Sequence, residues 1–341
     1  MIVQYNWTYV QILGATGFVG SHALKQLSQI ANINLIAACR DSSKLPKIFT
    51  GEVRQGDIRD EVYLSNLFNN VDVVVNAIAW SSIWGRASDS NKLFLQPSLK
   101  LIDYFMQSLA KKYINLSSTT VSATNGSHDA LSPGKAPIFW PHFANAIKIE
   151  NHLRQLANDK KTIINLRFGI FVGENYALGL LPILVPRLKS HLVPWVAGGQ
   201  TTMPIIDGRD IGQAIALAAT NESLSQYQSF NAIGPTMPKV REVIEFLNSE
   251  YQLPKPHFNV PFFIAYRFAW LMEKLDSIVP WEPLIVRSII LLLEETHTNN
   301  DKISQTLGYQ PQYHWKESIK SQMTEMSARQ KSPMKMAKPT T

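Results

Sequence analysis

Three glycines spaced three residues apart, Gly14, Gly17 and Gly20, constrain this chain more than any other feature. The apolar residues 10–13 before them predict a strand, and Phe18–Leu27 carries apolar residues at helical spacing. In such a strand–turn–helix unit one glycine permits the tight turn, one lets the backbone approach a diphosphate, and one lets helix and sheet pack closely. The first N–H groups of the helix attract phosphate oxygens. We therefore predict a dinucleotide site formed by Gly14, Thr16, Gly17, Phe18, Val19 and Gly20.

Short apolar runs alternate with stretches of helical period through the first half of the chain. The predicted strands after the first are residues 33–38, 71–75, 113–116 and 162–166, and the predicted longer helices are residues 92–112 and 141–157. Strands that alternate with helices favour a doubly wound parallel sheet, an α/β Rossmann fold.

The composition and pattern of the sequence change after Gly173, where proline becomes frequent and helical patterns occur without matching strands. We predict a dinucleotide-binding domain at residues 1–173. A smaller, mainly helical substrate-side region follows at 174–327, with some segments that return to complete the sheet. Residues 328–341 hold four basic residues and no acid, and are predicted to be a disordered basic tail.

Composition limits the class of protein. The net charge is +7, of which the tail supplies +4, and no nucleic-acid-binding motif accompanies it, so no nucleic-acid partner is expected. No uncharged apolar run reaches the ~18–20 residues that span a bilayer, and no secretory signal pattern opens the chain. Cys39 is the single cysteine, which excludes an intrachain disulfide. We expect a cytoplasmic protein without a metal site.

The end of the second predicted strand bears on the choice of dinucleotide. An acid there holds the ribose 2′-hydroxyl of NAD, whereas an arginine accommodates the 2′-phosphate of NADP. This chain has Cys39 at the acid position, followed by Arg40 and Asp41. We therefore favour NADP(H) over NAD(H), with Arg40 as the phosphate partner, while Asp41 keeps NAD open as the alternative.

Several motifs together resemble a known family. The glycine turn is followed by Gly-Asp-Ile-Arg-Asp at residues 56–60 and Asn-Ala-Ile-Ala at 76–79. These segments are similar to extended (atypical) short-chain dehydrogenases/reductases of the NAD-dependent epimerase/dehydratase superfamily. Residues 198–211 and 307–311 resemble its 3β-hydroxysteroid dehydrogenase-like branch. The resemblance implies that Asp57 and Ile58 flank the adenine, and that Ala77 and Ala79 line the cofactor cleft.

The same resemblance implies hydride transfer with a serine, a tyrosine and a lysine that handle the proton. Ser118 matches the serine at the end of a strand, and Lys148 matches the lysine, which also binds the nicotinamide ribose. The tyrosine belongs four residues before the lysine, where this chain has Ala144. No tyrosine lies between Tyr113 and Tyr176, so no shift of register restores it.

Two consequences of Ala144 stay open. His142, or a water held by Lys148, Ser118 and Asn145, relays the proton in an active enzyme, although His142 points about 200° away from position 144 on a helix. Alternatively, the protein keeps the dinucleotide and has lost the reaction, and its bound cofactor is structural or a redox signal.

The C-terminal half bears on the substrate. Residues 262–293 are rich in apolar side chains, interrupted by Pro280-Trp281-Glu282-Pro283. The resembling branches cap their substrate cleft with this region, which implies an apolar small molecule with a carbonyl or secondary alcohol. We weight core helices or a homodimer interface above a substrate role, and membrane-surface association is the third alternative. A nucleotide-sugar epimerase or dehydratase is the remaining function that this fold supports.

Overall fold

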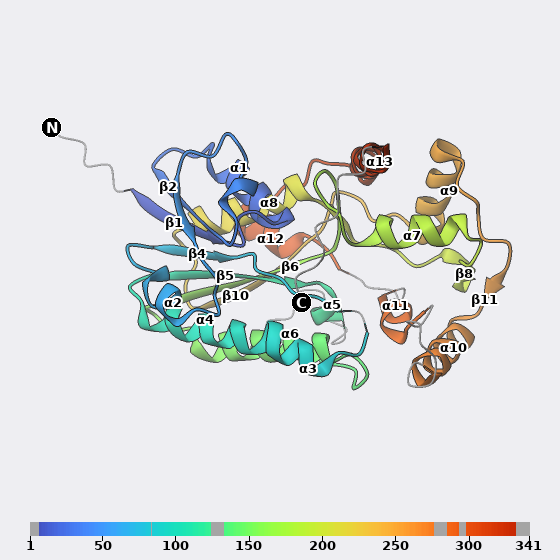
Figure 1. The fold of residues 1–341 in the computed structure, drawn as a ribbon, viewed down its shortest axis with the longest axis horizontal. Helices are drawn as coiled ribbons and strands as arrows, with labels where there is room; N and C mark the ends of the chain where they lie inside the picture. Colours follow the sequence, from blue (N-terminus) through green and yellow to red (C-terminus); the bar gives the residue numbers. More distant parts are fainter. Residues whose placement is uncertain (1–6, 83, 124–132, 276–284, 293–297, 332–341) are drawn as a thin grey trace.

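A seven-stranded parallel sheet forms the centre of the molecule (Figure 1). The computed structural model describes residues 7–82, 84–123, 133–275, 285–292 and 298–331. The strands run in the order β10-β6-β5-β4-β1-β2-β3, and all neighbouring pairs are parallel. This confirms the doubly wound α/β fold. The strands are β1 Thr8–Leu13, β2 Ile33–Cys39, β3 Glu52–Gln55, β4 Val73–Asn76, β5 Lys112–Ser118, β6 Thr162–Phe168 and β10 Tyr227–Ala232.

Helices cover both faces of the sheet (Figure 1). One face packs against α1 (Phe18–Leu27), α8 (Gly208–Thr220) and α12 (Asp301–Leu307), and the other against α2 (Glu61–Leu67), α4 (Gln96–Gln107) and α6 (Pro141–Leu156). Because both faces are covered, side chains on both sides of the central strands are buried, as in the fully buried β4. Two hydrophobic cores result, one on each side of the sheet.

The predicted helix at residues 92–112 is wrong at both ends. The chain forms α3 (Ala87–Ser90) and a π-helical turn (Asn91–Leu95) before α4, and α4 ends at Gln107. Lys112 instead begins β5, where its amine is buried and donates to the carbonyl oxygens of Ala218, Ala219 and Asn221 at the end of α8. From the sequence alone, a lysine that caps the end of a distant helix cannot be told from an exposed lysine on a helix of its own.

The later part of the chain builds a second, mainly helical region beside the carboxyl ends of the strands. Two short parallel pairs stiffen it, β7 (Ile170–Val172) with β9 (Ile205–Asp207) and β8 (Trp195–Val196) with β11 (Asn259–Val260). Its helices are α7 Leu180–Lys189, α9 Val240–Tyr251, α10 Phe262–Leu275, α11 Arg287–Leu292 and α13 Trp315–Lys331. A further short helix, α5 (Thr120–Ala123), directly follows β5. No helix in the described ranges is both long and apolar enough to cross a membrane.

Two expectations for the C-terminal half change. Helix α13 continues through Lys331, four residues into the range predicted to be a disordered tail, and residues 332–341 lie outside the described chain. Helix α10 is not a core helix, because it buries only Ala265, Ala269 and Glu273. The predicted interruption at residues 280–283 also lies outside the described residues.

A buried ion pair fixes α6 to the sheet. Arg167 on β6 and Glu150 on α6 are both fully buried, with Arg167 Nη2 2.7 Å from Glu150 Oε2 and Nε 3.2 Å from each carboxylate oxygen. Such a charge is tolerated inside a protein only when it is paired and hydrogen-bonded. The pair therefore sets the position of α6, which carries residues 144 and 148.

We expect Glu150→Gln to lower the free energy of unfolding by about 3–5 kcal/mol, because Arg167 stays buried after losing this carboxylate. Urea titration measures the change. Glu245→Gln is the matched control, since Glu245 pairs with Arg241 at 3.5 Å on the surface, and it should cost less than about 1 kcal/mol. Equal losses in the two variants would contradict the assigned role of the buried pair.

Candidate active site

The predicted site residues lie in a row at the carboxyl ends of the strands. Asp57 follows β3, Arg40 follows β2, Gly14 follows β1, Ala77 follows β4, and Ser118 ends β5. These five strands are consecutive neighbours in the sheet, so at about 4.8 Å per strand the row spans about 19 Å. The strand order reverses between β1 and β4, and open parallel sheets bind ligands at such a switch point, outside the carboxyl ends of their strands.

Backbone packing explains two of the three glycines. Gly14 has φ +73°, and a Cβ there would lie 2.8 Å from the carbonyl oxygen of Ala77, so the β1 turn and the end of β4 nearly touch. At Gly20 a Cβ would lie 2.3 Å from the carbonyl oxygen of Gly14. Any side chain at these two positions would force the turn away from helix α1 or from β4.

Gly17 is different, because it is exposed and the one contact that a Cβ would make there is tight rather than overlapping. It has an extended backbone (φ −79°, ψ 171°), it is exposed, and a Cβ would meet only the carbonyl oxygen of Gly14, at 3.2 Å. The absence of a side chain here therefore keeps a space open on the solvent side of the turn. A ligand that approaches the backbone closely needs this space.

The start of α1 offers unsatisfied donors to that space. Gly17 is the N-cap and makes no side-chain capping bond, so the first-turn N–H groups of Phe18, Val19 and Gly20 lack the usual capping oxygen. The first turn also contains no acidic side chain that would repel an anion. The bare amides, the helix dipole and the opening at Gly17 fit a dinucleotide diphosphate.

The residues that follow β2, predicted to lie on the adenine side of the dinucleotide, differ in their burial, hydrogen bonds and ion pairs. Cys39 is buried at the end of β2, and its burial raises the pKa of the thiol. Asp41 faces its own loop, where it accepts hydrogen bonds from Ser43 N and Oγ and pairs with Lys44 at 3.1 Å. Arg40 is exposed, and no described residue forms a hydrogen bond or ion pair with its guanidinium.

Asp57, predicted to lie at the adenine, is held by Arg59. It accepts hydrogen bonds from Arg59 Nε at 2.9 Å, Nη2 at 2.6 Å and the backbone N–H at 2.9 Å. These bonds lower the pKa of Asp57 to about 2, and the charge of Arg40 adds to the shift. The carboxylate is therefore ionised and fixed at neutral pH, and Arg40 lies within its electrostatic reach. Ile58 packs against the core beside α2 and α4.

Further along the row, the residues after β4 are tied to the end of β1. The backbone N–H of Ala77 donates to Leu13 on β1, which ties the two strand ends together. Buried Asn76 accepts a hydrogen bond from Ile78 N at 3.2 Å and turns the chain away from the sheet. Ala79, with its small side chain, is exposed at this turn.

Ser118 occupies the carboxyl end of β5, next to β4. Its hydroxyl donates to Thr120 Oγ1 at 3.1 Å and accepts from Thr120 N at 3.3 Å, so the two hydroxyls form a pair at the start of α5. Ser118 is exposed at the strand end. The structure therefore presents Ser118 where the sequence places the catalytic serine, and it adds Thr120 as a partner.

Helix α6 presents Ala144 and Lys148 beside this strand end. A small apolar cluster of Val121, Trp140, Phe143 and Ile147 packs the first half of α6 against α5. Lys148 is exposed, and no described residue forms a hydrogen bond or ion pair with its amine, including Ser118. Asn145, by contrast, is buried and donates to Ser90 and Asn91, so both amide hydrogens are used in packing.

His142 lies in an aromatic environment. Its ring is 4.6 Å from that of Phe94 and 5.6 Å from that of Trp80, and its buried Nδ1 has no hydrogen-bond partner among the described residues. Burial lowers its pKa to about 4, so the imidazole is neutral at pH 7. A ring packed in this way is poorly suited to deliver a proton at position 144.

A cavity of about 300 Å³ opens one helical turn before Ala144, and no pattern in the sequence predicts it. Two aromatic side chains, Trp84 and Phe139, line it together with Arg86, Lys274 and Arg287 and a single carboxylate, Glu273. Arg287 lies over the Phe139 ring at 4.1 Å and pairs with Glu273. These residues come from four separate segments, and only the fold brings them together.

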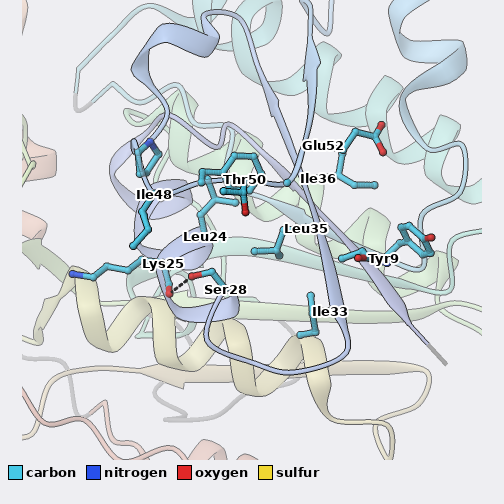
Figure 2. Close-up of a pocket in the computed structure, with 14 residues that line it drawn as sticks. Tyr9, Leu24, Lys25, Ser28, Ile33, Leu35, Ile36, Ile48, Thr50 and Glu52 are labelled. Atoms are coloured by element: carbon cyan, nitrogen blue, oxygen red, sulfur yellow. Dashed lines mark hydrogen bonds between the residues drawn. The ribbon is translucent and has the colours of Figure 1, made fainter. Parts of the chain in front are cut away.

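A second cavity, of about 480 Å³, lies elsewhere (Figure 2). Leu24, Lys25 and Ser28 of α1, Ile33 of β2 and the loop before β3 line it, as Figure 2 shows. Because Tyr9 and Ile33 stand at the beginnings of β1 and β2, this cavity opens at the amino ends of the strands. It is therefore separate from the row of site residues at the carboxyl ends.

Comparisons with known proteins bear on the family and on the fold of this chain. The profile described as "NAD dependent epimerase/dehydratase family" matches residues 10–232. A search of curated proteins finds no relative of this sequence.

Among solved structures, the epimerase Mth375 of Methanothermobacter thermautotrophicus is 18% identical, with a TM-score of 0.70 over 96% of this chain and 94% of that one. The Bordetella bronchiseptica enzyme WbmG in complex with NAD is 16% identical, with a TM-score of 0.67 over 96% of each chain. The Bacillus cereus UDP-glucuronic acid 4-epimerase, solved with UDP-glucuronic acid and NAD, is 15% identical, with a TM-score of 0.66 over 94% and 99%.

Two alanine substitutions in the glycine turn should have opposite consequences. Gly17→Ala should keep the fold but weaken binding of NADPH at least about tenfold, because the methyl group enters the space beside the bare amides. Gly20→Ala should lower stability by about 1–3 kcal/mol, because its Cβ collides with the backbone of Gly14. Nicotinamide fluorescence and urea unfolding measure the two effects. Unchanged NADPH affinity in Gly17→Ala would remove the diphosphate from this turn.

Proposed function

The chain belongs to the NAD dependent epimerase/dehydratase family, and from this premise we propose that it is an oxidoreductase that uses a nicotinamide dinucleotide. Its reaction is hydride transfer between the dinucleotide and a carbonyl or secondary alcohol of a small molecule. The observation that carries the proposal is the opening at Gly17 beside the uncapped amides of α1, at the switch point of the sheet. When bound, the nicotinamide supplies or accepts the hydride.

The proton follows a route without tyrosine. Ala144 has no group that donates or accepts a proton, so the side chains that remain at the site are Ser118, Thr120 and Lys148. The paired hydroxyls of Ser118 and Thr120 hold the substrate oxygen, and the Lys148 amine, which is not engaged elsewhere in the described chain, orients a water. That water exchanges the proton with solvent. Buried His142 takes no part.

The preferred dinucleotide in this proposal is NADP(H). The usual acid position is occupied by buried Cys39, and Asp41 is engaged by Ser43 and Lys44. Arg40 is exposed and unpaired within the described chain, which suits a 2′-phosphate. The Bordetella and Bacillus neighbours carry NAD, so a preference for NADP would be a property of this chain.

The substrate in this proposal occupies the 300 Å³ cavity beside α6. Trp84 and Phe139 contact its apolar body, as an apolar carbonyl compound requires. The apolar side chains of α10 do not line this cavity, since Phe263, Phe268 and Trp270 face solvent. Three cationic residues against one carboxylate in the lining favour a substrate that also carries an anionic group.

Ala144 itself favours a second candidate function, a dinucleotide-binding protein that no longer catalyses the family reaction. In that case the bound cofactor serves structure or redox sensing, and the hydroxyl pair and Lys148 have no substrate to hold. The two candidates share the dinucleotide site and differ only in turnover.

The cofactor preference predicts that Arg40→Ala weakens NADPH binding about tenfold or more and leaves NADH binding nearly unchanged, because only NADPH loses a charge-assisted contact. Lys47→Ala removes an exposed charge from the same loop and serves as the matched control. Fluorescence titration with each dinucleotide gives the ratio. An equal effect of Arg40→Ala on both dinucleotides would overturn the preference.

Turnover separates the active from the retired protein. We expect NADPH oxidation by the wild type with a panel of ketones that carry an anionic group, and a loss of about 10²-fold or more in kcat in Ser118→Ala and Lys148→Ala. Nucleotide sugars are tested separately by chromatography of the products, because epimerisation regenerates the dinucleotide and consumes no NADPH. Their selective conversion would point to the epimerase chemistry instead. Tight NADPH binding without turnover in the wild type, together with activity in Ala144→Tyr, would establish the retired function.

A further inference from the structure

Helix α10 has a large apolar face that no other part of the described chain covers. We define the α10 face as Phe263, Ile264, Arg267, Phe268, Trp270 and Leu271. Its five apolar side chains are 46–62% exposed. Figure 1 shows α10 at the periphery of the molecule, beside α11 and away from the sheet. Contiguous exposed apolar side chains of this size mark a surface that binds a partner.

The opposite side of α10 is firmly docked, so the α10 face has a fixed orientation. Ala265 and Ala269 are buried against Ile290 of α11, with Val260 and Val196 packed around them. At the last turn, Glu273 accepts hydrogen bonds from the backbone N–H of Arg287 at 2.7 Å and from its Nε at 2.6 Å. The docked side of α10 is made of small and half-buried apolar residues, and its bulkiest apolar side chains face outward.

Charge selects the partner. Arg267 lies in the middle of the α10 face, and Lys274 is exposed about two turns further along. The one acid of α10, Glu273, is buried and paired with Arg287. The α10 face itself contains no acidic residue that could pair with Arg267 of a second copy. A surface that is both apolar and negatively charged complements the α10 face.

We propose that the α10 face docks on the surface of an anionic lipid bilayer. A helix that is docked on its protein by one side, and that exposes aromatic, aliphatic and basic side chains on the other, can lie in the plane of the interface with its exposed apolar side at the headgroup boundary. Trp270 and Phe268 enter the interface, while Arg267 contacts lipid phosphates. Glu273 and Lys274 also line the cavity beside α6, so docking holds that cavity near the lipid. The proposal goes beyond hydride transfer and does not require it.

Vesicle sedimentation of the full chain tests the proposal. The wild type should bind vesicles of equal parts phosphatidylcholine and phosphatidylglycerol, and should bind pure phosphatidylcholine much less. Raising NaCl from about 0.1 M to about 1 M should weaken binding, because the Debye length falls from about 10 Å to about 3 Å. Phe268→Asp should abolish binding. Leu109→Asp should not, because Leu109 is also exposed (92%) but lies outside the α10 face.

Two further variants separate lipid docking from loss of structure. Arg267→Gln should weaken partitioning about fivefold, and Lys160→Gln, an equal loss of exposed charge, should have little effect. Trp270→Phe keeps the apolar surface, so it should still bind while losing part of the tryptophan quenching by brominated lipids. All variants should bind NADPH like the wild type, which verifies the fold and keeps this test independent of the proposed reaction.

Three results would overturn the proposal. Vesicle binding that survives Phe268→Asp would assign the lipid contact to another surface, such as the basic carboxyl end. Equal binding to neutral and anionic vesicles would remove the role of charge. A concentration-dependent dimer in sedimentation velocity that Phe268→Asp dissociates, without vesicle binding by the wild type, would make the α10 face a contact between two copies.

Discussion

The close approach of the β1 turn to the end of β4 is the constraint on which the site depends. Gly14 takes a left-handed conformation with no side chain, and the carbonyl of Ala77 lies where its Cβ would be. This contact sets the direction in which α1 leaves the sheet, and Gly20 lets the helix begin directly against the turn. The uncapped amides of α1 therefore point outward at the switch point, in line with the residues that follow β2, β3 and β5.

The other half of the site depends on α6, and α6 depends on a charge pair in the core. Glu150 and Arg167 hold the helix on β6 with no exposed surface on either side chain. The cluster around Val121 and Phe143 then fixes its first turns beside the end of β5. Position 144, where the family resemblance implies a tyrosine, holds an alanine on this helix, and Lys148 follows one turn later. This combination makes the fate of the proton the main chemical question for the protein.

The fold and the dinucleotide side of the site followed from local sequence patterns. The glycine turn, the valine run of β4 and the period of α1 each reflect neighbours that are close in sequence, and all three were predicted. Features that depend on distant segments were not. The polar edge strand β3 lacks an apolar pattern, because it is largely exposed. Lys112 looked helical because its partners lie more than 100 residues away on α8.

The cavity beside α6 and the orientation of α10 could be predicted even less from the sequence, because both depend on distant segments. Trp84, Phe139 and Arg287 form one cavity, yet no spacing in the sequence connects them. The apolar residues of α10 were predicted to form a core helix or a homodimer interface, because hydrophobicity alone does not say which side of a helix is covered. Ala265 and Ala269 form the buried side, and the larger side chains remain outside.

The most direct test of the central claim is a crystal structure of the chain with bound NADPH. The account predicts diphosphate oxygens within hydrogen-bond distance of the N–H groups at Phe18 and Val19, with Gly17 against the ligand. A dinucleotide bound away from the start of α1, or a protein side chain filling the space beside Gly17 in the complex, would contradict it.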